Sequence, residues 1–395
     1  MRPRCEGTGR RHRGLLGALC VLLLGSLTGC SLLPTWLGGS TEAKFPPLPP
    51  IEGGTAVPVL WQVSVGARQQ SLLTPALLGD RIVAAHPDGT VVVVDARSGA
   101  VQQRFSTGTA RGALAGGVAA REGLIVVTTA GGWALAFDET GRRLWEARLP
   151  TEAISPAALT ASTVVVVTID GGVTGLDART GARRWFLQRQ LPALTLRAAA
   201  PPKAAGELVY WGTPSGRLLA LDASNGAVLW ENTVATPRGT SELERLIDVL
   251  GQPSLGNNRV CAAAYQGRIA CFDAARGTLL WHRDISSLVG TLMDERFVYS
   301  VDEKGVAYAL DLSTGATVWR RDVLAGRRAS GLALLGERLA IQDMQGHVHV
   351  LDRANGRILA RALGEGFESL APLVASAHAF VTQTRSGQLV ALAAR

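Results

Sequence analysis

Three stretches of the chain follow nearly the same pattern: "SGRLLALDASNGAVLW" at residues 215–230, "QGRIACFDAARGTLLW" at 266–281 and "KGVAYALDLSTGATVW" at 304–319. Each has an alternating apolar run that ends in aspartate, a short segment with a glycine, and a second run that ends in tryptophan. Alternating apolar runs predict half-buried β-strands. Aspartate followed by glycine predicts the tight turn between them. The repeated unit is therefore a β-hairpin built on an aspartate turn.

The aspartate of this unit recurs along the whole chain. It stands at seven positions, 38 to 51 residues apart: Asp95, Asp138, Asp177, Asp222, Asp273, Asp311 and Asp352. An eighth copy, "SGQLVALAAR", has Ala393 in that place. Strand repeats with a period near 40 residues are typical of β-propeller blades.

The chemistry of the repeated unit is structural. We expect the aspartate to accept backbone N–H bonds and the glycine four residues later to supply a positive φ. We expect the outer-strand tryptophan to pack between neighbouring blades. These aromatic positions are Trp145, Trp185, Trp230, Trp281 and Trp319, while the first copy has Phe105 nearby and the seventh has Ala360.

The two ends of the repeat region complement each other. The last copy lacks an outer strand, and "VLWQVSV" at residues 59–65 is an outer-type strand with Trp61 and no partner of its own. Pairing these segments closes a ring and removes exposed sheet edges. The sequence predicts an all-β fold over residues 56–395: an eight-bladed β-propeller closed by pairing an N-terminal strand with the C-terminal blade.

The first residues have the features of an export signal. A basic start is followed by a short apolar run, which predicts a signal peptide over residues 1–29. "Leu27-Thr28-Gly29-Cys30" resembles the bacterial lipobox, and this resemblance implies cleavage before Cys30 and its lipidation. Because Ser31 rather than aspartate follows, the resemblance implies an outer-membrane anchor that faces the periplasm. An ordinary signal peptide with an incidental Cys30 is the alternative.

Residues 30–55 are rich in proline and glycine and predict a flexible tether that follows the lipidated cysteine. The formal net charge is +8, and residues 1–29, with five arginines and one glutamate, hold half of it. No stripe of lysine and arginine with interleaved aromatic residues indicates nucleic-acid binding. Nor does the chain contain a phosphate loop or a serine nucleophile elbow.

Two histidines, His347 and His349, stand on one face of a strand. A metal site needs three or four ligands, and no third is visible, so we expect no metal and no cofactor. Cys261 and Cys271 flank the hairpin "AAAYQGRIA" on one face and lie opposite each other. In an oxidising compartment they are candidates for a disulfide. The alternative is two small apolar residues in a core.

Two insertions break the repeat, at residues 187–206 and 231–254. Both follow an outer strand and precede the next inner strand, so they fall side by side on one rim, and insertions of this kind commonly form the binding face. The first carries Leu191, Leu194, Leu196 and Arg197, which suits capture of a partner segment. In the second, "SELERLIDVL" predicts a short helical turn. The alternative is that the leucines fold inward and fill a gap between blades.

Taken together, the lipobox, the tether, the eight repeats, "LPALTLR" and "SELERLIDV" resemble the BamB family of lipoproteins. The resemblance implies a non-enzymatic scaffold in the β-barrel assembly machinery, which binds BamA through a periplasmic POTRA domain and works with other BAM subunits and unfolded outer-membrane proteins. The positions that match the family's binding residues are Leu194, Leu196, Arg197 and Asp248. A second acidic position of the family is Leu250 here, which leaves the electrostatic part of the contact open.

Two other readings of the sequence stay open. The blade skeleton also resembles quinoprotein dehydrogenases, which use pyrroloquinoline quinone and calcium, and this implies an oxidoreductase. The chain lacks the added cofactor loops of that family, and a shared fold does not transfer chemistry. A propeller that binds an envelope ligand such as peptidoglycan is the third reading.

Overall fold

The computed structural model describes residues 45–51, 55–67, 73–196, 200–364, 367–369 and 371–394. The predicted signal peptide, Cys30 and most of the predicted tether lie outside these residues, as does Arg197. Residues 46–395 form one compact unit. Among the described residues, no helix has the length and apolar character needed to cross a bilayer.

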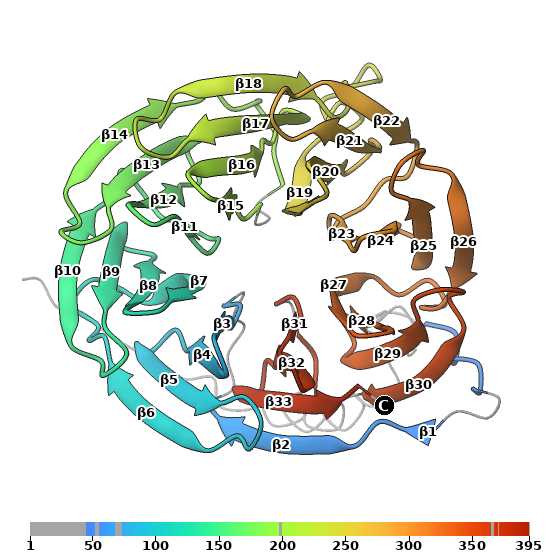
Figure 1. Ribbon diagram of the computed structural model, residues 1–395, viewed down its shortest axis with the longest axis horizontal. Coiled ribbons are helices and arrows are strands. Elements are labelled where there is room, and N and C mark those ends of the chain that lie inside the picture. Colours follow the sequence, from blue (N-terminus) through green and yellow to red (C-terminus); the bar gives the residue numbers. More distant parts are fainter. Residues whose placement is uncertain are drawn as a thin grey trace, which may run out of the picture. The chain divides into compact units, whose positions relative to one another are not determined.

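The described strands form eight antiparallel blades around a ring (Figure 1). The first four blades, each from its inner to its outer strand, are β3 (Ala76–Leu78), β4 (Arg81–Ala85), β5 (Thr90–Asp95) and β6 (Val101–Ser106); β7 (Leu114–Arg121), β8 (Leu124–Thr129), β9 (Trp133–Phe137) and β10 (Arg143–Arg148); β11 (Ala158–Leu159), β12 (Thr163–Val167), β13 (Gly172–Asp177) and β14 (Arg183–Gln188); β15 (Lys203–Ala205), β16 (Leu208–Gly212), β17 (Arg217–Asp222) and β18 (Val228–Thr233).

The remaining blades are β19 (Val249–Gly256), β20 (Arg259–Ala264), β21 (Ile269–Asp273) and β22 (Leu279–Arg283); β23 (Leu292–Met293), β24 (Phe297–Val301), β25 (Val306–Asp311) and β26 (Thr317–Asp322); β27 (Ala329–Leu335), β28 (Arg338–Asp343), β29 (His347–Asp352) and β30 (Ile358–Leu363); β31 (Val374–Ala375), β32 (Ala379–Gln383), β33 (Gln388–Ala393) and β2 (Val59–Ser64). A short strand, β1 (Thr55–Ala56), adds in parallel to the outer edge of β30.

The eighth blade is built from both ends of the chain, as predicted. Strand β2 pairs with β33, and Trp61 stands opposite Ala391. Figure 1 shows these two strands side by side at the point where the ring closes. The predicted eight-bladed ring, closed by an N-terminal strand, is confirmed.

The aspartate turns and the tryptophans connect neighbouring blades at most of the junctions of the ring. In the third blade, Oδ1 of Asp177 accepts backbone N–H bonds from Arg179 and Thr180, at 3.0 and 2.8 Å. In six junctions the indole Nε1 donates to the carbonyl that follows the next blade's aspartate, at 2.8 to 3.2 Å. These pairs are Trp61 with Ala96, Trp145 with Ala178, Trp185 with Ala223, Trp230 with Ala274, Trp281 with Leu312 and Trp319 with Arg353.

Glycine is required in these turns for two reasons. Gly226 has a φ of 77°, which side chains rarely adopt. A Cβ placed on it would also lie 2.6 Å from the ring of Trp185. The tryptophan therefore packs against the glycine itself, and the predicted wedge between blades is confirmed.

The junction between the seventh and eighth blades is built differently. Ala360 takes the place of tryptophan, and Ala393 takes the place of the turn aspartate. The incoming chain fills this junction: β1 pairs with β30, and Ala393 N–H donates to the Pro58 carbonyl at 3.0 Å. Val57 is buried there with Ala360 and Leu392. The two departures from the repeat are thus one feature, a junction closed by the N-terminal segment.

The end of the predicted tether contacts this part of the ring. Arg327 Nη2 donates to the Pro46 carbonyl at 2.9 Å, and Arg361 Nη1 donates to the Pro49 carbonyl at 3.2 Å. Both arginines hold main-chain carbonyls, so the contacts do not depend on the side chains of the proline-rich segment.

Because strands alternate in direction, the blades have two distinct faces. The aspartate turns and the hairpins between first and second strands lie on one, which we call the turn face. The turns between second and third strands and the connections between blades lie on the other, which we call the connection face. Both insertions are connections between blades, and they therefore lie on the connection face.

Candidate partner-binding site

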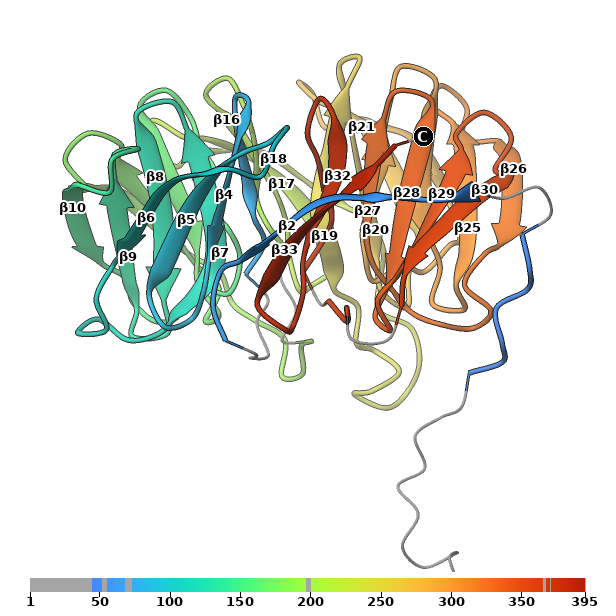
Figure 2. The ribbon, with the colours of Figure 1, turned by 90° about the horizontal axis from the view of Figure 1, so that it is seen from below.

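The two insertions project from the same face of the ring. Figure 2 shows the β14–β15 and β18–β19 connections below the blades, on one side. They also meet, since Leu196 in the first connection donates its N–H to Asp248 in the second. The site is therefore one continuous surface over the third, fourth and fifth blades.

The first insertion turns its leucines in different directions. Leu194 is 41% exposed, whereas Leu191 and Leu196 are half-buried and line a pocket beneath the loop. Leu191 and Leu196 therefore fold inward, as the alternative interpretation expected. Leu194 faces outward, where a partner can contact it. Arg197 lies outside the described residues.

The second insertion holds a single helical turn rather than a helix. Arg245 N–H donates to the Ser241 carbonyl at 3.0 Å. The Glu244 carboxylate accepts from the Ser241 N–H at 3.1 Å, and Glu244 N–H donates to Ser241 Oγ at 3.2 Å. This reciprocal pair is a capping box, which satisfies the free amides at the start of the turn, and the predicted short helical turn is confirmed. The described residues contain no longer helix here.

The capped turn displays Leu243, which is 66% exposed, while Leu246 and Ile247 are buried. Leu243 was not among the predicted binding residues. Its only mark in the sequence is its place between Glu242 and Glu244, in the charged start of "SELERLIDVL". The turn thus presents one apolar side chain on the connection face, the face that also carries Leu194.

Asp248 is buried, with 1% of its surface exposed. Its Oδ2 accepts the Leu196 N–H at 2.5 Å, and its carbonyl accepts the Tyr265 N–H at 2.8 Å. Burial raises the pKa of Asp248 to about 6, against the lowering effect of the Leu196 hydrogen bond. The carboxylate thus holds the first insertion against the fifth blade, which makes it a positioning residue for the loop.

Leu250 is buried as well, with 3% exposed, and it lines the same pocket. An acidic side chain at this position would lie inside the surface. The difference from the family pattern therefore removes no exposed charge from the connection face of this chain.

A pocket of about 280 Å³ lies beneath the first insertion. Its lining comes from the third to fifth blades and both insertions: Ile154, Ser155, Val167, Thr168, Ile169, Gly171, Leu191, Thr195, Leu196, Ala200, Trp211, Gly212, Pro214, Asp248, Val249 and Leu250. It is mostly apolar, and Asp248 is its one carboxylate. This combination of apolar walls with few polar groups is typical of a binding pocket.

The histidine pair belongs to a buried network in the seventh blade. His347 Nδ1 and His349 Nε2 lie 3.2 and 3.4 Å from Oδ2 of Asp343, and Arg361 Nε donates to His349 Nδ1 at 3.3 Å. Burial lowers the pKa of His349. Burial alone would raise the pKa of Asp343, but the bonds from both histidines outweigh it and lower that pKa. Within the described ranges, no group of three His, Cys, Asp or Glu side chains could hold a metal ion.

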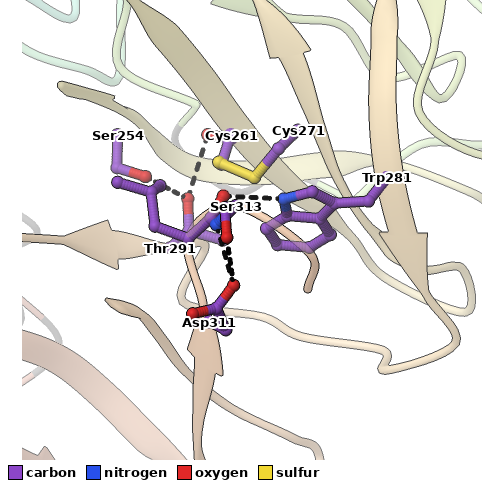
Figure 3. Close-up of a disulfide and its surroundings, with 8 residues drawn as sticks. Ser254, Cys261, Cys271, Trp281, Thr291, Asp311 and Ser313 are labelled. Atoms are coloured by element: carbon purple, nitrogen blue, oxygen red, sulfur yellow. Dashed lines mark hydrogen bonds between the residues drawn. A yellow bond between two sulfur atoms is a disulfide. The ribbon is translucent and has the colours of Figure 1, made fainter. Parts of the chain in front are cut away.

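Cys261 and Cys271 form a disulfide across β20 and β21 (Figure 3). Their Cα atoms lie 4.1 Å apart, and both side chains are fully buried. The bond packs beside Trp281, and Thr291 Oγ1 donates to the Cys261 carbonyl at 2.9 Å. It links the strands of the fifth blade, whose turn holds the carbonyl of Asp248.

Comparison with known proteins places this geometry in a family. The family model described as outer membrane protein assembly factor BamB matches residues 87–321 and 304–395. The outer membrane protein assembly factor BamB of Bordetella pertussis is 38% identical over 384 residues, which cover 96% of this chain and 97% of that protein.

Solved structures of other proteins have the same fold. The crystal structure of BamB from Moraxella catarrhalis matches with a TM-score of 0.77 and 26% identity, over 86% of this chain and 100% of that one. A quinohemoprotein alcohol dehydrogenase from Comamonas testosteroni matches with a TM-score of 0.66 and 12% identity, over 86% and 76% of the two chains, which shows the fold alone. This chain belongs to the BamB family of outer membrane protein assembly factors.

Proposed function

We propose that this chain is a non-enzymatic scaffold subunit of the β-barrel assembly machinery. It binds BamA through a periplasmic POTRA domain, together with other BAM subunits, and assists the assembly and insertion of β-barrel proteins into the outer membrane. One observation carries the proposal: two insertions, joined by Asp248, present the exposed leucines Leu194 and Leu243 on one face.

This arrangement suits docking for a physical reason. When a partner covers exposed apolar side chains on loops, the removal of that surface from water stabilises the complex. Loops that are ordered before binding lose less conformational entropy when they bind. The hydrogen bond from Leu196 to Asp248 and the capping box of Ser241 and Glu244 supply that order here.

The export signal supports the location of this work. We propose cleavage of residues 1–29, lipidation of Cys30, and an outer-membrane anchor that holds the propeller in the periplasm. The residues concerned lie outside those described, so mass spectrometry of the mature N-terminus is the test. A diacylated Cys30 supports the anchor, and an unmodified N-terminus at another residue contradicts it.

The docking proposal is tested by affinity capture from detergent-solubilised outer membranes with the tagged full chain. Replacing Leu194 and Leu243 together by serine should lower recovery of BamA at least about tenfold, because a partner that covers two leucines buries apolar surface that stabilises the complex by more than about 1.4 kcal/mol. Leu229→Ser is the matched control, since Leu229 is 52% exposed on outer strand β18, away from the connection face. Undiminished recovery with the double variant contradicts the proposal.

Contact with unfolded barrel proteins is a separate part of the proposal. The pairing of β1 with β30 supports it, because an outer strand there accepts a further strand. Photocrosslinkers placed on exposed outer-strand positions such as Leu229 and Val318 should capture nascent barrel proteins in cells. Consistent absence of such products would remove this part and leave the BamA contact untouched.

A further inference from the structure

Asp248, which lines the pocket beneath the first insertion, has one carboxylate oxygen without a hydrogen-bond partner in the described part of the chain. Oδ2 of Asp248 accepts the Leu196 N–H, but Oδ1 is buried and has no hydrogen-bond partner among the described residues. A buried acceptor without a donor is unfavourable, and native structures rarely keep one without a reason. The described turn aspartates contrast with it, as Asp177 receives two backbone bonds and a bond from Arg184.

The walls around this carboxylate restrict what can satisfy it. Ile154, Ile169 and Leu191 are apolar, and Thr168 Oγ1 already donates to Asp170 at 2.6 Å. The other donor-bearing side chains of the lining, Ser155, Thr195 and Trp211, form no hydrogen bond with Oδ1 of Asp248. At about 280 Å³, the pocket lies below the size range of drug-like ligand sites, so it suits one large side chain.

The number of donors narrows the class of side chain further. A guanidinium group carries five N–H donors and an ammonium group three, and apolar walls would leave most of them unsatisfied. Tyrosine and tryptophan carry an apolar ring with a single O–H or N–H donor. Their shape and their single donor match a pocket with one orphan acceptor.

We propose that this pocket receives one aromatic side chain of the docking partner, a tyrosine or tryptophan, whose O–H or N–H donates to Oδ1 of Asp248. The inference rests on the proposed function for the identity of the partner, but the pocket's preference is a property of this chain alone. Asp248 then has two tasks: Oδ2 holds the loop, and Oδ1 receives the partner's donor.

The preference is tested with small probes on the full folded chain. Indole carries the ring and the N–H, and indene has nearly the same shape without the donor. Binding is followed by the change in the NMR shift of the Leu196 amide. Indole should bind with a dissociation constant on the order of 1 mM, as expected of a fragment. Indene should bind about tenfold more weakly, because a hydrogen bond to a charged group is lost. Equal binding of the two probes, or no binding by indole, overturns the proposal.

Asp248→Asn separates the two tasks of the carboxylate. The amide oxygen still accepts the Leu196 N–H, while an N–H₂ donor replaces Oδ1. Slow hydrogen exchange of the Leu196 amide should persist, and the preference for indole over indene should disappear. If the variant keeps the preference, Asp248 only positions the loop and the proposal fails.

Ala200→Leu fills the pocket from its wall and should abolish binding of both probes. Retained binding would place the probes elsewhere and contradict the proposal. The outcomes are distinct from those of the capture experiment. Equal binding of indole and indene, together with BamA recovery that falls in the double leucine variant, removes only the pocket. A preference for indole together with undiminished recovery in that variant removes only the BamA contact.

Discussion

The two faces of the ring use aspartate in opposite ways. On the turn face, Oδ1 of Asp311 accepts hydroxyl and backbone bonds from both Ser313 and Thr314, and these bonds lower its pKa to about 2. On the connection face, Asp248 is buried with one donor, and burial raises its pKa to about 6. The repeated aspartates stabilise the fold. Asp248, which is not part of the repeat, keeps one carboxylate oxygen at the site without a hydrogen-bond donor from the described residues.

The largest effect is expected where a turn meets the neighbouring tryptophan. Gly315 has a φ of 70°, and a Cβ on it would lie 2.5 Å from Trp281. Gly315→Ala should lower the free energy of unfolding by about 3 kcal/mol, the sum of backbone strain and a displaced ring. Urea unfolding measures it.

Gly336→Ala is the matched control on the same face. Gly336 also has a positive φ, of 55°, but its Cβ would meet nothing within 4 Å. This variant should lose only about 1 kcal/mol, from backbone strain. Equal losses in the two variants would show that the tryptophan contact adds nothing to the turn.

The disulfide comes next, because it supports the blade that holds Asp248. Replacing Cys261 and Cys271 by alanine should cost about 3 kcal/mol, mainly through the freer unfolded chain. Thiol titration adds a check: because both cysteines are fully buried, the native protein should resist reduction that the unfolded chain undergoes. Two reactive thiols in the native protein would contradict the disulfide.

The pH dependence of Asp248 tests the connection-face side of the comparison. A folded pKa of about 6, above the ordinary 3.8, means that ionisation disfavours the folded state. Wild type should lose up to about 3 kcal/mol relative to Asp248→Asn as pH rises from about 4 to about 6, and no more beyond pH 7. Parallel stability curves for the two proteins would show that burial does not perturb this carboxylate.

Asp311 should show the opposite sign and the smallest effect. Because its folded pKa is lowered to about 2, it contributes stability above pH 4 that is lost as pH falls toward 2. For this solvent-screened group the expected loss relative to Asp311→Asn is about 1 kcal/mol. If the stability of the wild type relative to Asp311→Asn rises as the pH falls, the turn hydrogen bonds do not stabilise the ionised form of Asp311.

Periodicity explains which parts of the fold could be predicted. Asp177, Gly226 and Trp185 recur at fixed places in the repeat, and each has a local reason to be there. The structure of the junction at Ala360 and Ala393 could not be predicted from the repeat, because both residues depart from it. Strand β1, which fills this junction in place of a tryptophan, is two residues long and pairs in parallel, so it leaves no pattern in the sequence.

The site was only partly predictable for a similar reason. The insertions marked the correct face, and "SELE" marked the capped turn. The direction of each side chain depends on contacts between distant segments, such as Leu196 with Asp248. Aspartate is usually exposed, so its burial at position 248 had no local signal. Leu243 was missed because one apolar residue in a polar loop is a common occurrence.

The split eighth blade also affects how the chain can fold. Strand β2 is synthesised before the first seven blades, but its partner β33, at residues 388–393, is synthesised after them. Until those residues are available, the nascent protein is an open arc with unpaired strands at both ends, which is a state prone to aggregation. Loss of β33 would leave the arc open and expose the edges of both β2 and β32 to pairing with other chains.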